Sequence, residues 1–225
     1  MGVKIEYKGH RLINTKYPPI ALFDDVASPE EFEMLYAIQA LTNPRLRDEV
    51  GDICLIDDPA EIPFNCLRGR SYAVAPFTHI NPKGGRFNDG LFGALYVADN
   101  AHTAALEVKV HQQQYWQNIE GLEYDRFLFR GLLISHQSAP IYHVCGDDSA
   151  ILNPDCYAAA QQLARKVKKE GFQAIEYPSV RAEDALCWAI FTPKPITDVV
   201  QSYLVEMIWN GEQIAEVNTV ENLGV

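Results

Sequence analysis

The glycine-rich loop at residues 84–90 and the two segments after it place the strongest limits on how this chain folds. The loop reads Gly84-Gly85-Arg86-Phe87-Asn88-Asp89-Gly90 and precedes the short apolar run 94–98, which is typical of a buried strand. Asp99-Asn100 then offers an N-cap for a helix over about residues 101–117. A loop, a buried strand and a helix in immediate succession predict helices packed on a sheet.

Further predicted elements extend this pattern along the chain. Apolar and β-rich runs predict strands at residues 127–134, 140–144, 174–177, 187–191, 203–209 and 213–217. Helices are predicted at about 29–42, where Ser28-Pro29 forms a start signal, and at about 154–170, which Gly171 ends. The chain has no internal repeat, and this mixture of strands and helices predicts an α+β fold.

The length of 225 residues suits one domain with an elaborated end. Residues 1–20 are polar and predict an extended lead-in, while residues 44–65 are rich in Asp and Pro. We therefore expect residues 1–65 to form an N-terminal extension with one helix. This extension would pack on a core domain of residues 66–225.

Charge and composition disfavour several classes of function. A net charge of −11 and a pI near 4.9 disfavour a broad nucleic-acid footprint, which needs a basic face, and docking on an anionic membrane. No apolar run approaches the roughly 20 residues that cross a bilayer, and the N-terminus lacks the apolar core of a signal peptide. Five widely spaced cysteines without a CxxC pair are typical of reduced thiols. We expect a cytoplasmic protein without direct nucleic-acid or membrane binding.

Three residues on separate segments suit a site for a phosphorylated, sugar-bearing ligand. Arg86 follows two glycines, which let backbone approach a ligand, and its guanidinium can bind phosphate through two parallel hydrogen bonds. Glu107 lies in an apolar stretch of the predicted helix, where a carboxylate needs a cavity, a partner or solvent. Ser179 follows a predicted strand, and strand ends often line clefts. The structural alternatives are a surface-turn arginine, a glutamate at the edge of the helix's wet face, and a turn-capping serine.

For other residues the sequence does not decide between a functional and a structural role. Tyr96 belongs to the predicted buried strand, where its hydroxyl needs a partner, and Arg70 and Arg181 are each a second phosphate ligand or a surface charge. Glu107 and His111 have the i, i+4 spacing of some metal sites, but no second ligand pair accompanies them, so we expect no metal. The absence of a Gly-x-Ser-x-Gly elbow and of a P-loop disfavours hydrolase triads and NTPases.

Together these motifs resemble the RES-domain family, which is named for its arginine, glutamate and serine. The resemblance spans about residues 68–215. It rests on Gly85-Arg86-Phe87-Asn88-Asp89-Gly90, on 93–98, on Thr103-Ala104-Ala105-Leu106-Glu107-Val108, on 171–181 and on 187–193. One departure is Ala182-Glu183-Asp184-Ala185, where many members have a glycine-containing turn.

The resemblance implies a mixed sheet flanked by helices, similar to ADP-ribosyltransferases of the diphtheria-toxin type. It implies the toxin of a bacterial toxin–antitoxin pair, with an Xre-type helix-turn-helix antitoxin as its partner. NAD⁺ would be the substrate, with no separate cofactor. Carried over to this chain, the site is Arg86, Tyr96, Glu107 and Ser179, of which Glu107, Arg86 and Ser179 are catalytic and Tyr96 binds substrate. Tyr177, Arg70 and Arg181 are our further candidates for substrate binding.

The implied chemistry is cleavage of the nicotinamide–ribose bond, which creates positive charge on the ribose as glycoside hydrolysis does. A carboxylate at Glu107 would stabilise that charge, and Arg86 would hold the pyrophosphate. Three functions stay open: an NAD⁺ glycohydrolase or phosphorylase, a mono-ADP-ribosyltransferase that modifies a protein, and a non-catalytic nucleotide-binding or partner-binding module. The oligomeric state, including a homodimer, is open as well.

Overall fold

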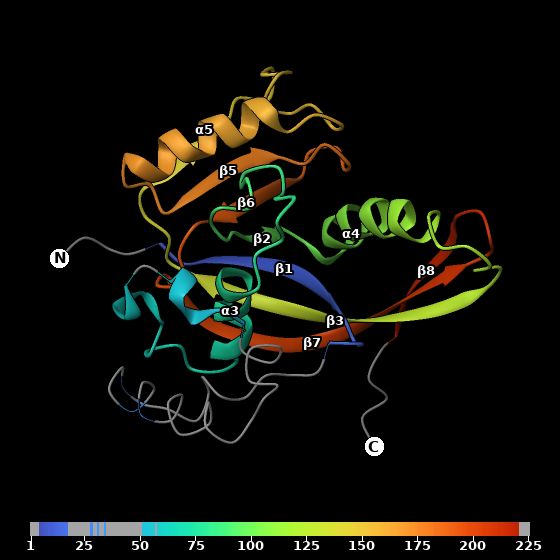
Figure 1. Cartoon of the computed structure of the whole chain (residues 1–225), viewed down its shortest axis with the longest axis horizontal. Helices are drawn as coiled ribbons and strands as arrows, with labels where there is room; N and C mark the ends of the chain where they lie inside the picture. Colours follow the sequence, from blue (N-terminus) through green and yellow to red (C-terminus); the bar gives the residue numbers. More distant parts are fainter. Residues whose placement is uncertain are drawn as a thin grey trace.

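The computed structural model describes residues 5–17, 51–56 and 58–220, together with Ser28, Glu31 and Met34. Its centre is a sheet with the strand order β4-β5-β6-β2-β1-β3-β7-β8 (Figure 1). The strands are β1 (Tyr7–Asn14), β2 (Leu95–Ala98), β3 (Asp125–His136), β4 (Ile141–His143), β5 (Ala174–Pro178), β6 (Leu186–Ile190), β7 (Ile196–Trp209) and β8 (Ile214–Val220). Strands β4 and β5 are parallel, and the other neighbours are antiparallel. This mixed sheet, with helices on it, confirms the α+β fold.

Two hydrophobic clusters cover opposite faces of the sheet, because side chains alternate along each strand. In β2, Val97 belongs to one cluster and Tyr96 packs against the other. Helix α3 (Arg70–Thr78) contributes to the first cluster, while α4 (Ala101–Trp116) and α5 (Ala158–Lys169) contribute to the second. Figure 1 shows α4 and α5 on one side of the sheet and α3 on the other. Tyr96 therefore faces the space beneath α4 and α5.

The first strand, β1, lies in the middle of the sheet, between β2 and β3. All eight of its residues pair with β3. Gly9 permits its close approach to β2, because a Cβ there would stand 2.6 Å from Cγ2 of Val97. The predicted extended lead-in thus supplies a central strand, and the sheet crosses the boundary predicted between residues 65 and 66.

Most of the helix predicted over residues 29–42 lies outside the described residues. Within them, Glu31 and Met34 are helical. The Oγ of Ser28 accepts a hydrogen bond from the N–H of Glu31 at 3.2 Å. An N-cap serine satisfies the first turn of a helix through a bond of this kind.

Helix α5 begins at Ala158 rather than near residue 154. The Oδ1 of Asn153 accepts hydrogen bonds from the N–H groups of Asp155 and Cys156, so these residues form a turn before the helix. The end of α5 is as predicted, since Gly171 adopts a left-handed conformation with φ of +86°.

Helix α3 and the first half of β7 have no counterpart among the predicted elements. Pro76 lies inside α3, where a proline is unfavourable, and this obscures the helical pattern. The early part of β7 carries Asp198, Gln201 and Ser202, which interrupt its apolar alternation. The short helices η1 (Ile53–Leu55) and η2 (Pro59–Glu61) precede α3. The remaining predicted strands and the helix at 101–117 are confirmed, with small differences at their ends.

The described helices include none that is both long and apolar enough to cross a membrane. All five cysteines are free thiols, of which Cys66 and Cys187 are buried and the other three exposed.

Candidate functional site

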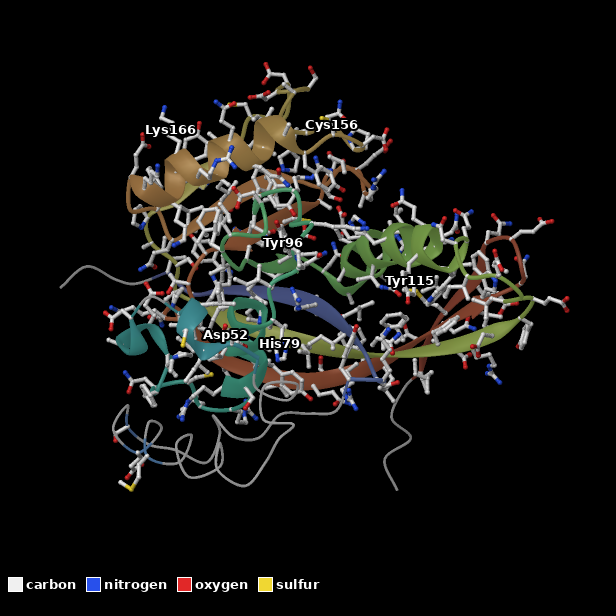
Figure 2. The ribbon with its side chains drawn as sticks, viewed as in Figure 1. Asp52, His79, Tyr96, Tyr115, Cys156 and Lys166 are labelled. Atoms are coloured by element: carbon white, nitrogen blue, oxygen red, sulfur yellow. The ribbon has the colours of Figure 1, made fainter. Side chains whose placement is uncertain are left out.

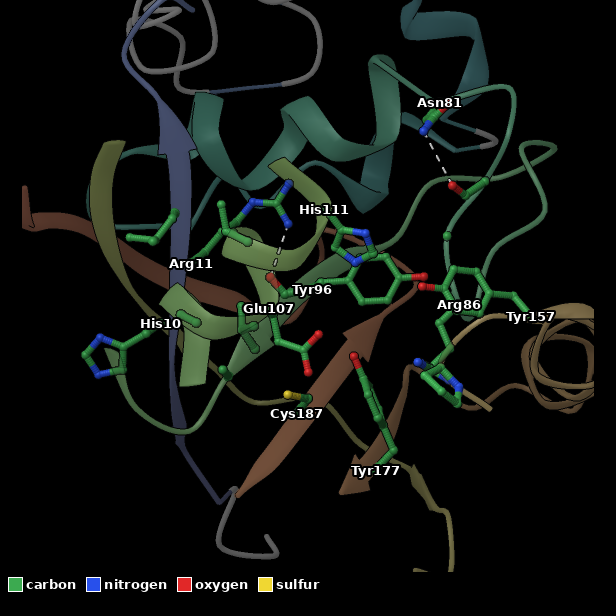
Figure 3. A pocket seen from close by; sticks show the side chains of 18 of the residues that line it. His10, Arg11, Asn81, Arg86, Tyr96, Glu107, His111, Tyr157, Tyr177 and Cys187 are labelled. Carbon is green, nitrogen blue, oxygen red and sulfur yellow. Dashed lines mark hydrogen bonds between the residues drawn. The ribbon is translucent and has the colours of Figure 1, made fainter. Parts of the chain in front are cut away.

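A cavity of about 590 Å³ opens on the α4 side of the sheet (Figure 3). It lies between the glycine-rich loop, the central strands, α4 and the segment before α5. Small-molecule sites have volumes of about 300–1,000 Å³, so this cavity has the size of a binding site. Figure 2 places one of its lining residues, Tyr96, near the centre of the molecule, whereas Lys166 lies on the outer side of α5.

Glu107 and Ser179 meet at the edge of this cavity. The Oγ of Ser179 donates a hydrogen bond of 2.7 Å to Oε1 of Glu107. The same Oγ accepts hydrogen bonds from the N–H groups of Arg181 at 3.1 Å and Ala182 at 3.2 Å. Two backbone donors therefore orient the hydroxyl toward the carboxylate. Ser179 therefore caps a turn and also contacts Glu107, so the structural and the functional role predicted for it occur together.

Helix α4 presents Glu107 to the cavity because its neighbours Ala104 and Ala105 are buried against the sheet. The helix starts at an N-cap as predicted, where Oδ1 of Asn100 accepts the N–H of Thr103 at 2.8 Å. Four residues after Glu107, His111 also lines the cavity. Partial removal of water lowers the pKa of His111, and the Glu107 carboxylate opposes this change.

Arg86 is buried in the wall of the cavity. Its Nη1 donates to the backbone carbonyls of Asn153 at 2.6 Å and Ile151 at 3.3 Å. Its guanidinium carbon lies 4.7 Å from the centre of the Tyr157 ring. The surface-turn alternative for Arg86 is wrong, because the side chain is only 8% exposed.

Tyr96 holds the loop that carries Arg86. Its hydroxyl accepts the N–H of Phe87 at 2.8 Å and donates to Oδ1 of Asn88 at 2.7 Å, which provides the partners expected for a buried phenol. Burial raises the pKa of Tyr96 above its ordinary value. Gly85 allows this arrangement, because a Cβ there would stand 2.8 Å from Oδ1 of Asn88 and 2.9 Å from the Tyr96 hydroxyl.

Tyr177 and Cys187 form the floor of the cavity from β5 and β6. Figure 3 shows the Tyr177 hydroxyl and the Cys187 sulfur near the Glu107 carboxylate. Burial is the main cause that raises the pKa of Tyr177 well above its ordinary value and the pKa of Cys187 to about 12, and the Glu107 charge acts in the same direction. Both groups are therefore neutral near pH 7, and the thiol has little nucleophilic character.

Arg11 of β1 is a second cation in the cavity, and sequence reasoning did not select it. Its Nη1 donates to the backbone carbonyl of Tyr96 at 3.1 Å, while its buried Nε has no hydrogen-bond partner among the described residues. Burial lowers the pKa of Arg11 to about 10, so the charge remains at neutral pH. The only local signal was an arginine in a polar N-terminal segment, which is common in surface chains.

The two remaining predicted residues lie apart from the cavity lining. Arg181 follows Ser179 and donates from Nη2 to the carbonyl of Pro154 at 3.3 Å. Arg70 lies in α3, on the opposite side of the sheet, and donates to the backbone carbonyls of Pro63 and Phe64. The structure does not bring Arg70 to the other predicted site residues. The described residues contain no group of three or more His, Cys, Asp or Glu side chains arranged to hold a metal ion.

The family model of the RES domain matches residues 62–210. The chain belongs to the RES-domain family. A RES match over this range includes Arg86, Tyr96, Glu107 and Ser179, and it leaves Arg11 outside.

The chain is also similar to one curated protein in sequence and to one solved structure. A protein of Sinorhizobium fredii (strain NBRC 101917 / NGR234), named "Uncharacterized protein y4oC", is 27% identical over 228 residues, covering 99% of this chain and 91% of that protein. A crystal structure of the MbcT–MbcA toxin–antitoxin complex of M. tuberculosis is similar with a TM-score of 0.36 and 14% identity. That similarity covers 62% of this chain and 73% of the other.

The segment that departs from the RES pattern, Ala182-Glu183-Asp184-Ala185, lies in the loop between β5 and β6. Asp184 in this loop has a φ of +52°, in the left-handed region that glycine adopts most readily. The Ser179 N–H nevertheless donates to the carbonyl of Ala185 at 2.8 Å, and its Oγ accepts two backbone N–H groups of the loop. The acidic turn therefore keeps Ser179 directed at Glu107.

Proposed function

We propose that this RES-domain protein is the toxin of a toxin–antitoxin pair and that it cleaves the nicotinamide–ribose bond of NAD⁺. The observation that carries the proposal is the hydrogen bond from Ser179 to Glu107 at the edge of a cavity that also holds Arg86 and Arg11. A fixed carboxylate in a cavity that two arginines also line suits a ligand that combines a ribose with a pyrophosphate.

Glu107 is the catalytic carboxylate in this proposal. As the bond to nicotinamide breaks, positive charge develops on the ribose ring, and the carboxylate stabilises it. Ser179 occupies Oε1, which directs the carboxylate and leaves Oε2 for a ribose hydroxyl. Because the serine is itself held by two backbone N–H groups, the geometry exists before the substrate binds.

Arg86 and Arg11 bind the pyrophosphate in this proposal. Arg86 is buried and Arg11 is half-buried with a buried Nε, and their hydrogen bonds within the described residues go to neutral backbone carbonyls. A charge removed from water is costly when its hydrogen bonds go only to neutral groups, and a bound anion relieves that cost. This local charge explains how a protein with a net charge of −11 would attract an anionic nucleotide.

The first test follows nicotinamide release from NAD⁺ by the purified protein, with and without inorganic phosphate. Release that depends on phosphate indicates a phosphorylase, and release without it indicates a glycohydrolase. Glu107→Gln should lower kcat by about 100-fold or more, while Glu120→Gln, the same change at an exposed glutamate after α4, should not. Equal rates in the two variants would remove Glu107 from the mechanism.

The main alternative is transfer of ADP-ribose to a protein, since the same carboxylate serves either acceptor. Transfer of label from adenine-labelled NAD⁺ to a macromolecule, with slow loss of bulk NAD⁺, would favour it. A non-catalytic module would instead bind the nucleotide and release no nicotinamide. We further propose an Xre-type helix-turn-helix antitoxin as partner, for which co-expression should relieve growth arrest caused by the wild-type chain.

A further inference from the structure

The hydrogen bonds of Arg86 leave one edge of its guanidinium available for a ligand. Nη1 is the nitrogen that both the Ile151 and Asn153 carbonyls engage. Within the described part of the chain, Nε and Nη2 carry no hydrogen bond. Together these two nitrogens form the side-on edge that binds two oxygens of a phosphate through parallel hydrogen bonds. The usefulness of this edge depends on what holds the plane of the guanidinium.

The ring of Tyr157 covers the guanidinium. Its centre lies 4.7 Å from the guanidinium carbon, and the ring also lines the cavity. Figure 3 shows Tyr157 beside Arg86, on the side of the cavity away from His10. An aromatic face attracts a cation at this distance, and the attraction increases when water is excluded. Tyr157 therefore restricts the rotation of the guanidinium about its side chain.

Gln161 holds the backbone on both sides of Arg86. Its Nε2 donates to the carbonyl of Gly85 at 2.9 Å and to that of Asn88 at 3.3 Å. Residues four apart lie on one face of a helix, so Tyr157, at the N-cap of α5, and Gln161, in its first turn, point the same way. The start of α5 thus contacts both the side chain of Arg86 and the loop that carries it.

We infer that Tyr157 and Gln161 are positioning residues that set the side-on edge of Arg86 for a pyrophosphate-bearing ligand. The measurement of NAD⁺ turnover rests on the proposed function. The measurement of ADP-ribose binding does not depend on it. Tyr157 acts through its ring and Gln161 through its two N–H donors. Neither residue takes part in bond cleavage, so both should change binding of substrate more than the rate of chemistry.

The test measures KM and kcat for NAD⁺, and the dissociation constant of ADP-ribose by calorimetry. Tyr157→Leu should raise the KM and the dissociation constant about five- to tenfold while kcat changes less than twofold. Tyr157→Phe should have the wild-type KM and dissociation constant, because it keeps the ring. Gln161→Met, which keeps the length and removes the donors, should resemble Tyr157→Leu. Tyr124→Leu, at an exposed tyrosine outside the cavity, is the matched control.

A double variant separates positioning from general stability. If Tyr157 acts through Arg86, adding Tyr157→Leu to Arg86→Ala should not weaken ADP-ribose binding further. Additive losses in the double variant would overturn the inference, and so would unchanged ADP-ribose binding in Tyr157→Leu or Gln161→Met. A wild-type protein that binds ADP-ribose but releases no nicotinamide would refute the proposed cleavage and leave the positioning test intact. A wild-type protein that does not bind ADP-ribose would overturn the inference.

Discussion

Replacement of His136 should remove a pH-dependent part of the protein's stability. This histidine ends β3, is fully buried, and stacks on Tyr7 with ring centres 5.3 Å apart. Its Nδ1 lies 3.0 Å from the Oγ of Ser138, and its buried Nε2 has no partner among the described residues. Burial lowers the pKa of His136 from 6.5 to about 4, because a charge there would lose its water without a compensating partner.

The direction of the effect follows from this lowered pKa. The unfolded chain takes up a proton near pH 6.5 and the folded chain only near pH 4, so acid favours unfolding between these values. The contribution is complete above pH 6.5 and is lost as the pH falls. From the two pKa values, the contribution of His136 to the free energy of unfolding should fall by about 2 kcal/mol between pH 7.5 and pH 5, and by about 3 kcal/mol at pH 4.

Urea denaturation followed by tryptophan fluorescence at pH 7.5 and pH 5 measures this change. At pH 5 most carboxylates remain ionised, so histidines dominate the change, and because burial also lowers the pKa values of His10 and His111, the comparison with a His136 variant isolates its share. His136→Gln cannot titrate, and its loss of stability between the two pH values should be smaller than that of the wild type by about 2 kcal/mol. His102→Gln, at an exposed position of α4, should behave as the wild type. An equal pH dependence in His136→Gln and the wild type would refute the reasoning.

Three further predictions concern the site. Ser179→Ala should lower kcat for nicotinamide release about 10- to 100-fold with little change in KM, whereas Ser202→Ala, at an exposed serine, should leave kcat unchanged. An unchanged kcat in Ser179→Ala would show that Ser179 does not orient Glu107. Arg11→Met should raise the KM for NAD⁺ at least about tenfold without lowering the melting temperature, because it removes a half-buried charge whose Nη1 bonds to a neutral carbonyl and whose buried Nε has no partner among the described residues. A large loss of stability with unchanged KM would make Arg11 structural. Gly85→Ala should weaken ADP-ribose binding and destabilise the fold by about 1–2 kcal/mol, because its Cβ would collide with the Tyr96 hydroxyl. Gly146→Ala, where the nearest atom is 4.0 Å away, should do neither; calorimetry measures the binding and urea denaturation the stability.

Local patterns were sufficient for much of the fold. The helix that carries Glu107 is readable because its cap, Asn100, and its apolar spacing lie within a few residues of one another. The Schellman-type end of α5 at Gly171 is readable for the same reason, since Gly171 alone supplies the left-handed residue. The late start of α5 was missed because the side chain of Asn153 bonds to a turn rather than to a helix.

The sequence also carried the main candidates for the site, through the motifs around Arg86, Tyr96, Glu107 and Ser179. Their residue types indicated an anion-binding arginine, a buried phenol and a carboxylate, and the family match confirms that these motifs belong to a RES domain. What the motifs did not contain was the direction of each side chain. The bond between Ser179 and Glu107 joins residues 72 positions apart, and only the pairing of strands brings them together.

The composition and local order of the chain by themselves determined an α+β protein with capped helices and a glycine loop carrying Arg86. The tertiary structure alone decided which charges share a cavity. It brought Arg11 in from β1, placed Tyr157 and Gln161 against the loop of Arg86, and put Arg70 on the far side of the sheet. The physical reason is that helix caps and periodicity depend on neighbours along the chain, whereas strand order and the two faces of a sheet depend on pairing between distant segments.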